Sequence, residues 1–215
     1  QADSTSVIVE LPTHPDYGPP DQFAGPDHPM RKLTRAMAFG EPWTADDADR
    51  VASVFDGLAP AWSSDDVDPI KAAPVLDAID RGQAPLQSTW IELGSGTGDG
   101  ARLLHGRVDR HVCVDLSERM LAHAPELSPK VRADSSRLPF AENSADVVLL
   151  INMLLFPDEV DRVLRPGGHV VWVNSVGDQT PIHLPPADVA AALPGPWTGV
   201  ASHAGRGLWA VLHRV

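Results

Sequence analysis

The sequence predicts an α/β fold in which a doubly wound, mostly parallel sheet carries helices on both faces and ends in an antiparallel hairpin. From Thr89 onward, short apolar segments alternate with short helical segments, as in a sheet whose strands are buried on both faces. A glycine-rich loop lies between the first of these apolar segments and the first helical one. The alternation breaks only at the end, where two apolar segments flank the turn Ala204-Gly-Arg-Gly207.

Residues 1 to about 40 are rich in Pro, Gly and Asp without a clear period. We expect them to form an irregular arm that lies on another part of the protein. A helix should follow, because Thr44 and Asp47 form a capping-box pattern. Its expected apolar face consists of Ala48, Val51, Phe55 and Leu58, and Gly57 is placed to end it.

Asp68 and Pro69 predict the start of a second helix, with Asp as N-cap and Pro at the first helical position. This helix should stop at Gly82, and Pro74 should kink or shorten it. We therefore divide the chain into an N-terminal arm and helical lid, residues 1–85, and a core, residues 86–215.

The core predicts five strands, two hairpin strands and four helices. The strands are expected in TWIEL, HVCVDL, KVRAD, DVVLLI and HVVWV, the helices around Gly100–His105, Glu118–Ala124, Asp158–Leu164 and Ala187–Leu193, and the hairpin in Trp197–His203 and Leu208–Val215. Pro166-Gly-Gly168 should stop the third of these helices before the fifth strand. Only 16 residues separate Asn152 from His169, so that helix is expected to be unusually short.

The composition of the chain limits the kinds of partner and the location that we expect. A net charge of −12 disfavours a nucleic-acid partner. No apolar run is long enough to span a bilayer, and the first residues lack a basic start and a hydrophobic signal region, so we expect no membrane contact and a cytoplasmic protein. Arg outnumbers Lys, which favours a bacterial source. The missing initiator Met leaves open a start upstream of Gln1, and the oligomeric state is not indicated.

Cys113 is the single cysteine, which excludes an intramolecular disulfide and a multi-cysteine zinc site. In the apolar segment HVCVDL, a buried structural thiol is the expected role. No His-x-x-His motif or carboxylate cluster indicates a metal site. We therefore expect no metal, and cofactor binding that does not depend on a divalent ion.

The glycine loop, WIELGSGTGDG, places Gly94, Gly96 and Gly98 between a strand and a helix. Glycines there allow a sharp turn and a close approach of the backbone to a nucleotide, although a plain tight turn uses them too. Started at Gly94, the dinucleotide fingerprint needs a small residue where Asp99 stands. Started at Gly96 it fits and ends at Ala101, but that start is two residues late relative to the strand. Glu92 and Asp99 would also repel a pyrophosphate, whereas an acidic loop suits the sulfonium and amino groups of S-adenosylmethionine. The loop therefore favours S-adenosylmethionine over NAD.

Four blocks then occur in order: IELGSGTG, VDLSERML, ADSSRLPF with ADVVLLIN, and RVLRPGGHVV. From Trp90 to Gly168 the chain resembles the class I S-adenosylmethionine-dependent methyltransferases, in particular the small-molecule branch typified by quinone-biosynthesis enzymes. The resemblance implies a Rossmann-like core, S-adenosylmethionine as cofactor, S-adenosylhomocysteine as product and a small-molecule acceptor. Before residue 86 the resemblance is limited to the segment VFDGLAPAW, which loosely matches the family's N-terminal F-D-x-x-A segment.

The resemblance assigns a cofactor site at the strand ends. Asp115 would accept both ribose hydroxyls, a role it would equally have with NAD, while Ser117 fits the cap of the next helix better. Asp134 would accept from the adenine amino group, although Asp-Ser-Ser is also turn chemistry. The backbone of Asn152 would help to hold the methionine amino group. The backbone beside Asp134 would read a ring nitrogen, and Leu116 would pack on the adenine or, equally, belong to the apolar core. The full set is Glu92, Gly94, Ser95, Gly96, Asp115, Leu116, Asp134, Ser135 and Asn152.

The sequence identifies no catalytic residue. Methyl transfer needs a base only if the acceptor must lose a proton, and His183 and His28 are the candidates. Trp43 and Trp62 would line an apolar acceptor pocket, or are simply buried. The acceptor atom, O, N or C, is not indicated.

Two other functions stay open. A non-catalytic S-adenosylmethionine-binding protein would keep the glycine loop together with Asp115 and Asp134. An NAD(P)-dependent oxidoreductase would need a catalytic set such as Tyr-x-x-x-Lys, but Tyr17 is the only tyrosine.

Overall fold

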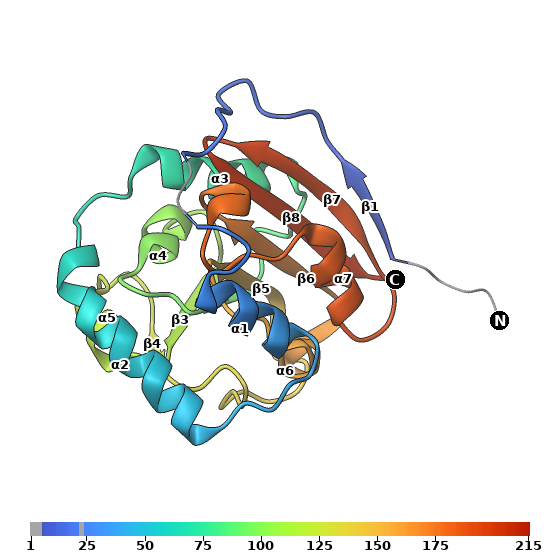
Figure 1. Cartoon of the computed structure of the whole chain (residues 1–215). Helices are drawn as coiled ribbons and strands as arrows, with labels where there is room; N and C mark the ends of the chain where they lie inside the picture. The colour runs from blue at the N-terminus through green and yellow to red at the C-terminus, as the bar shows by residue number, and fades with distance from the viewer. Residues whose placement is uncertain (1–5, 22–23) are drawn as a thin grey trace.

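The computed structural model describes residues 6–21 and 24–215, which form one eight-stranded sheet in the order β1-β7-β8-β6-β5-β2-β3-β4 (Figure 1). The strands are β1 (Val7–Glu10), β2 (Thr89–Leu93), β3 (Arg110–Asp115), β4 (Lys130–Arg132), β5 (Ala145–Ile151), β6 (Leu164–Asn174), β7 (Trp197–Ala204) and β8 (Gly207–Arg214). Among them only β8 runs antiparallel to its neighbours, β6 and β7. The predicted fold class, with its parallel sheet and terminal hairpin, is confirmed.

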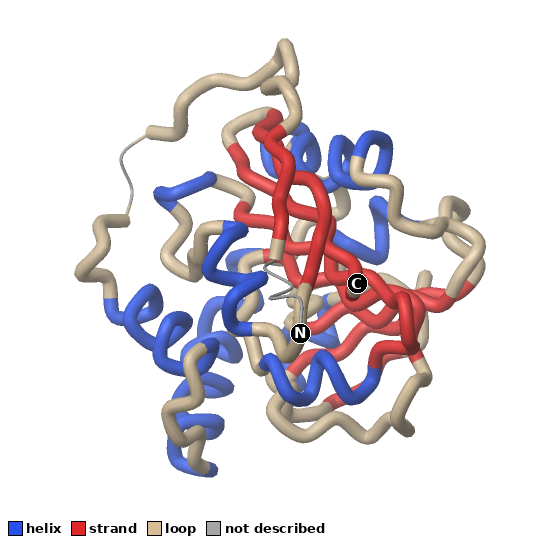
Figure 2. The backbone as a smooth tube through the Cα atoms, turned by 90° about the vertical axis from the view of Figure 1, so that its right-hand side faces the viewer, coloured by secondary structure: helices blue, strands red, loops and turns tan. Residues whose placement is uncertain are grey.

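Helices cover both faces of the sheet (Figure 2). They are α1 (Pro29–Ala38), α2 (Ala45–Trp62), α3 (Pro69–Arg81), α4 (Asp99–Leu104), α5 (Glu118–His123), α6 (Pro157–Val163) and α7 (Pro186–Ala192), with a short 3₁₀ turn at Gly177–Gln179. On one face, Val75 and Ile79 of α3 pack with Trp90. On the other, Val160 of α6 and Val189 of α7 join the second half of the core. No helix within the described ranges has the length and apolar character to cross a membrane.

The expectation of an irregular arm through residue 40 is wrong at two places. The first is β1, which pairs in parallel with β7 from Val7↔Thr198 to Glu10↔Ala201. Backbone bonds from Leu11 to Ala201 (2.8 Å) continue the pairing beyond the strand. The open edge of β7 supplies these partners, and the four residues of β1 carry little signal of their own.

The second is α1. Its N-cap is His28, whose ring accepts the Met30 N–H at 3.2 Å, and Pro29 occupies the first turn. Met30, Leu33 and Met37 recur at helical spacing, and all three join one apolar cluster. That periodicity was present in the sequence and could have identified the helix.

Both predicted N-terminal helices exist, but Gly57 does not end the first and Pro74 does not shorten the second. The capping box at Thr44 and Asp47 is present, yet α2 continues through Gly57 to Trp62. Gly57 adopts no left-handed conformation, so nothing stops the helix there. In α3 the helix runs unbroken through Pro74, whose buried ring packs beneath the hairpin turn at Gly207. Asp68 and Gly82 cap α3 as expected.

Pro166–Gly168 do not stop a helix. The short α6 already ends at Val163, and β6 begins at Leu164. The β5–β6 register jumps from Ala145↔Leu164 to Val147↔His169, so the Pro-Gly-Gly segment is an irregularity within β6. The seven-residue α6 agrees with the short crossover expected between these strands.

Candidate functional site

The candidate site lies at the edge where the parallel strands end. β2 pairs with β3 on one side and with β5 on the other, so the chain leaves β2 at the point where the strand order reverses. Open α/β sheets bind ligands in the crevice at this point. The glycine loop follows β2, Asp115 ends β3, Asp134 follows β4 and Asn152 follows β5, so all four predicted segments meet at one edge.

The glycine loop needs its glycines. Gly94, Gly96 and Gly98 have φ values of 66°, 54° and 88°, which side chains rarely adopt. A Cβ on Gly94 would lie 2.4 Å from the sulfur of Met153, so the end of β5 closes against the loop. A Cβ on Gly96 would meet no atom within 4 Å. The loop is therefore packed at Gly94 and open at Gly96.

Asp115 is bonded to this loop. Its Oδ2 accepts the Gly96 N–H at 2.7 Å, and its Oδ1 accepts the Ser117 N–H at 2.8 Å. Burial raises the pKa of Asp115, while these two backbone hydrogen bonds act to lower it. Ser117 Oγ caps α5 through Met120 N (3.0 Å), which confirms that the cap is Ser117 and not Asp115. Leu116, between them, is half-buried.

Asp134 makes two contacts. Its Oδ1 accepts the Ser136 N–H at 2.8 Å, which is the turn chemistry expected of Asp-Ser-Ser. Its Oδ2 accepts the indole N–H of Trp43 at 2.9 Å. One carboxylate oxygen of Asp134 is thus bonded to a residue of the N-terminal region. Ser135, beside it, is buried.

Asn152 ties β5 to β6. It is left-handed (φ 50°), its side-chain N–H donates to Ser175 Oγ at 2.8 Å, and its Oδ1 accepts the Ser175 N–H at 2.9 Å. Sequence reasoning missed Ser175, which directly follows β6. The side chain of Asn152 thus holds the two strand ends together, and its backbone N–H donates to Val173 O at 2.9 Å.

Glu92 and Asp99, the two carboxylates beside the glycine loop, lie in different surroundings. Glu92 is 1% exposed and turns toward α4, where a Cβ on Gly100 would lie 2.2 Å from its Oε1. Asp99 is half-buried at the start of α4, and burial raises its pKa. Ser95 is buried, and its N–H donates to Val114 O at 3.0 Å. Glu92 is therefore placed beneath the loop rather than on its open side.

The N-terminal helices reach the same edge. Trp43 stacks edge-on against Phe156 at 5.4 Å and belongs to an apolar cluster with Met37, Leu154 and Ile182. On α2, Asp56 accepts hydrogen bonds from Ser117 and Arg119 of the α5 segment, a tie that the sequence did not indicate. Trp62 is 52% exposed and contacts Phe55. Of the two candidate tryptophans, only Trp43 contacts a predicted cofactor residue through its side chain.

The two candidate bases differ in environment. His28 accepts a backbone N–H as the cap of α1. His183 follows β6, and its Nδ1 lies 2.8 Å from Asn174 Oδ1. Burial, together with the positive charge of Arg31, lowers the pKa of His183 to about 4. At neutral pH this imidazole is therefore uncharged.

The lowered pKa of His183 predicts an acid-sensitive fold. Between pH 6.5 and about 4 the unfolded imidazole binds a proton and the folded one does not, so the stability present above 6.5 is lost as the pH falls. The free energy of unfolding of the wild type should therefore fall more steeply in this interval than that of His183→Gln. Urea denaturation across a pH series measures both slopes, with His123→Gln on the exposed end of α5 as the control. Equal slopes for the wild type and His183→Gln would contradict the assignment.

Comparison with known proteins agrees with this geometry. Residues 91–172 match the family model of a methyltransferase domain. A biotin biosynthesis bifunctional protein of Cellvibrio japonicus is 28% identical over 169 residues, covering 73% of this chain and 33% of that protein. An uncharacterized methyltransferase of Mycobacterium leprae is 32% identical over 114 residues, covering 45% of this chain and 42% of that protein. The chain thus spans less than half the length of either relative.

Among solved structures, a complex of the protein DhpI with S-adenosylhomocysteine superposes with a TM-score of 0.59. It covers 77% of this chain and 95% of that chain at 20% identity, so the likeness concerns the fold. The matched domain spans the glycine loop, Asp115, Asp134 and Asn152, which are the segments that the sheet brings to one edge. Residues 91–172 thus match a methyltransferase domain, and the likeness to DhpI shows that the two chains share a fold.

Proposed function

We propose that this chain transfers the methyl group of S-adenosylmethionine to a small-molecule acceptor by in-line displacement. The observation that carries the proposal is the bond between Asp115 and the N–H of Gly96. It fixes a carboxylate against the open part of the glycine loop, at the reversal of strand order where a nucleoside can enter.

The residues at this edge fit the cofactor. Each oxygen of Asp115 accepts one backbone N–H, and a carboxylate oxygen can accept further bonds, such as those of ribose hydroxyls. The space over Gly96 is free of a side chain, and the backbone of Asn152 lies at the end of the neighbouring strand β5. Asp134 is also placed for adenine, but its Oδ2 already accepts a hydrogen bond from the indole N–H of Trp43. The adenine amino group would share or displace that bond.

S-adenosylmethionine, when bound, supplies a methyl carbon already activated by its sulfonium. The chain then has to hold the acceptor in line and exclude water. Half-buried Trp43, Met153 and Phe156, packed against the buried apolar cluster, provide an apolar surface for this at the strand ends. Where the acceptor must lose a proton, neutral His183 would take it on Nε2, since its Nδ1 faces Asn174.

A small molecule is the proposed acceptor class. The apolar cluster at the edge suits a small apolar body, and the net charge of −12 opposes a phosphate backbone. The Cellvibrio japonicus relative is named for biotin biosynthesis, which supports an acceptor from small-molecule metabolism. A cytoplasmic location in a bacterium belongs to the same proposal, and the bacterial origin of the curated relatives supports that source.

We also propose a revised boundary between the N-terminal lid and the core, in place of the one between residues 85 and 86. α1 and α2 reach the strand ends, and we assign the lid to them. α3 instead packs its Val75, Ala78 and Ile79 against the sheet and belongs with the core. Truncation before residue 41 would remove β1 together with α1 and leave the edge of β7 unpaired, so single substitutions test the lid more cleanly.

Titration calorimetry tests the cofactor. S-adenosylmethionine and S-adenosylhomocysteine should both bind, whereas NAD should give no heat of binding. The reason is that Asp99 occupies the position at the start of α4 where the dinucleotide fingerprint has a small residue. Binding of NAD with no response to either adenosyl ligand would overturn the proposal in favour of an oxidoreductase. Binding of the adenosyl ligands without methyl transfer to any acceptor in a broad screen would favour a non-catalytic binding protein.

A further inference from the structure

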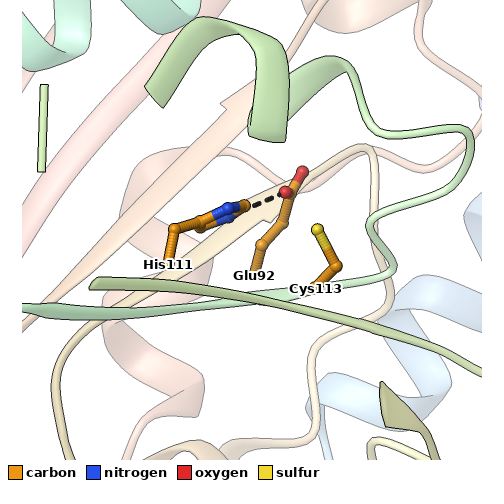
Figure 3. Close-up of side chains that lie close together, drawn as sticks. All are labelled: Glu92, His111 and Cys113. Carbon is orange, nitrogen blue, oxygen red and sulfur yellow. Dashed lines mark ion pairs between the residues drawn. The ribbon is translucent and has the colours of Figure 1, made fainter. Parts of the chain in front are cut away.

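Three potential metal ligands meet beneath the glycine loop (Figure 3). Glu92 lies on β2 directly opposite Cys113 on β3, and His111 lies two residues earlier on β3, on the same face of the sheet. Their ligand atoms all lie within 4.8 Å of one another, and the three side chains are at most 9% exposed. This proximity comes from strand register, because Glu92 and His111 stand 19 residues apart and form no sequence motif.

The polar atoms of this cluster lack ordinary hydrogen-bond partners. Glu92 Oε2 and His111 Nε2 approach to 3.0 Å, but neither is in a hydrogen bond of acceptable geometry. The thiol of Cys113, the third potential ligand, has Ser95 as a side-chain hydrogen-bond partner. Buried polar atoms are nearly always paired, and each exception needs an explanation. A cation between these atoms would satisfy them together.

The other nitrogen of His111 supports this arrangement. Its Nδ1 lies 2.8 Å from Ser128 Oγ, so a ring N–H on that side can donate to the hydroxyl. Metal-binding histidines almost always donate their second ring N–H to such a partner, which fixes the ring and leaves the first nitrogen free to ligate. In His111 this leaves the Nε2 lone pair directed into the cluster.

We propose that Glu92, His111 and Cys113 bind a zinc ion that holds β2 and β3 together. Imidazole, thiolate and carboxylate are zinc ligands, whereas Mg²⁺ and Ca²⁺ prefer oxygen alone. A metal bound by Cys113 would replace the proton of its thiol. The second carboxylate oxygen of Glu92 would complete the coordination. This proposal departs from the expectation, drawn from the sequence, that the chain binds no metal.

The site is separate from the proposed methyl transfer. Glu92 faces α4, where the absence of a side chain at Gly100 makes room for its carboxylate. The glycine loop leaves β2 just after Glu92, and we therefore expect the ion to stabilise the loop from below without touching the cofactor. Calorimetry with S-adenosylhomocysteine can succeed or fail independently of metal content.

Metal content and Co²⁺ substitution test the proposal. Purified full-length protein should carry about one zinc per chain by mass spectrometry of the metal. After removal of zinc, Co²⁺ should restore thermal stability and give a thiolate-to-metal charge-transfer band. That band can come only from Cys113, the single cysteine of the chain. Protein that binds no zinc and gives no such band with Co²⁺ would overturn the proposal.

Two variants keep the test decisive. Cys113→Ser should lose the band and bind zinc at least tenfold more weakly. If it does not fold, Ser128→Ala leaves all three ligands in place and should weaken zinc affinity by roughly 10–100-fold. His123→Gln, which removes an exposed histidine on α5, is the matched control and should change neither readout. Undiminished zinc affinity in the folded variants would assign the metal to surface histidines and overturn the site.

Discussion

Asp115→Ala is expected to weaken the binding of S-adenosylhomocysteine by tenfold or more. The substitution removes the acceptor proposed for the ribose hydroxyls, and a hydrogen bond to a charged group contributes about 1.5–3 kcal/mol. It also leaves the N–H of Gly96 without its 2.7 Å partner, so the loop loses the contact that orients it. Since about 1.4 kcal/mol corresponds to a factor of ten, loss of one such bond is sufficient for the effect.

The comparison needs variants that separate binding from folding. Asp115→Asn keeps one acceptor oxygen and should bind S-adenosylhomocysteine with intermediate affinity. Asp49→Ala, on the exposed surface of α2, is the matched control. Calorimetry gives the dissociation constants, and circular dichroism checks that each variant is folded. If folded Asp115→Ala binds as tightly as the wild type, the ribose contact is assigned to the wrong residue.

The strands of the core were predictable because each is a short apolar segment bounded by polar or turn residues. β2, β3 and β5 lie inside the sheet with neighbours on both sides, so their sequences carry the signal of burial on two faces. The terminal hairpin was equally visible from its turn. For these elements local pattern and tertiary context point the same way.

The N-terminal elements depend on partners far away in the sequence. β1 is a strand because β7, some 190 residues later, offers it an open edge. Pro74 stays inside α3 because the hairpin turn packs on its ring, an interaction that overrides the local preference. By contrast α1 carried its own periodicity and was overlooked.

In the candidate site, too, some features could be predicted from the sequence and others depended on distant contacts. Asp115 and Asn152 could be placed from sequence, because they stand at strand ends that parallel pairing brings together. The contact between Trp43 and Asp134 joins residues 91 positions apart, and the orientation of Glu92 toward His111 depends on the register of β2 and β3. Neither relation has a local signal, so both needed the structure.

The other large effect is expected at Trp43. Trp43→Ala should lower acceptor turnover by about tenfold to 100-fold, because a displaced acceptor loses its in-line alignment. The indole fills the space between Asp134 and Phe156, and it fixes the segment between α1 and α2 over the strand ends. Lids in this position exclude water and complete the site. Affinity for S-adenosylhomocysteine should be kept or increased, because the substitution frees Asp134 Oδ2 for the adenine amino group.

Two further tryptophan variants identify the cause of that loss. Trp43→Phe keeps an aromatic ring against Phe156 but has no N–H for Asp134, so it should retain most turnover and still bind S-adenosylhomocysteine at least as tightly as the wild type. Trp62→Ala removes the exposed tryptophan at the end of α2 and should change neither quantity. Release of S-adenosylhomocysteine in the presence of an acceptor found by screening measures turnover, and thermal melting follows stability. A Trp43→Ala protein that melts earlier but turns over normally would mean that the N-terminal helices only stabilise the sheet. The acceptor would then have to bind around Met153–Phe156 and His183, without help from a lid.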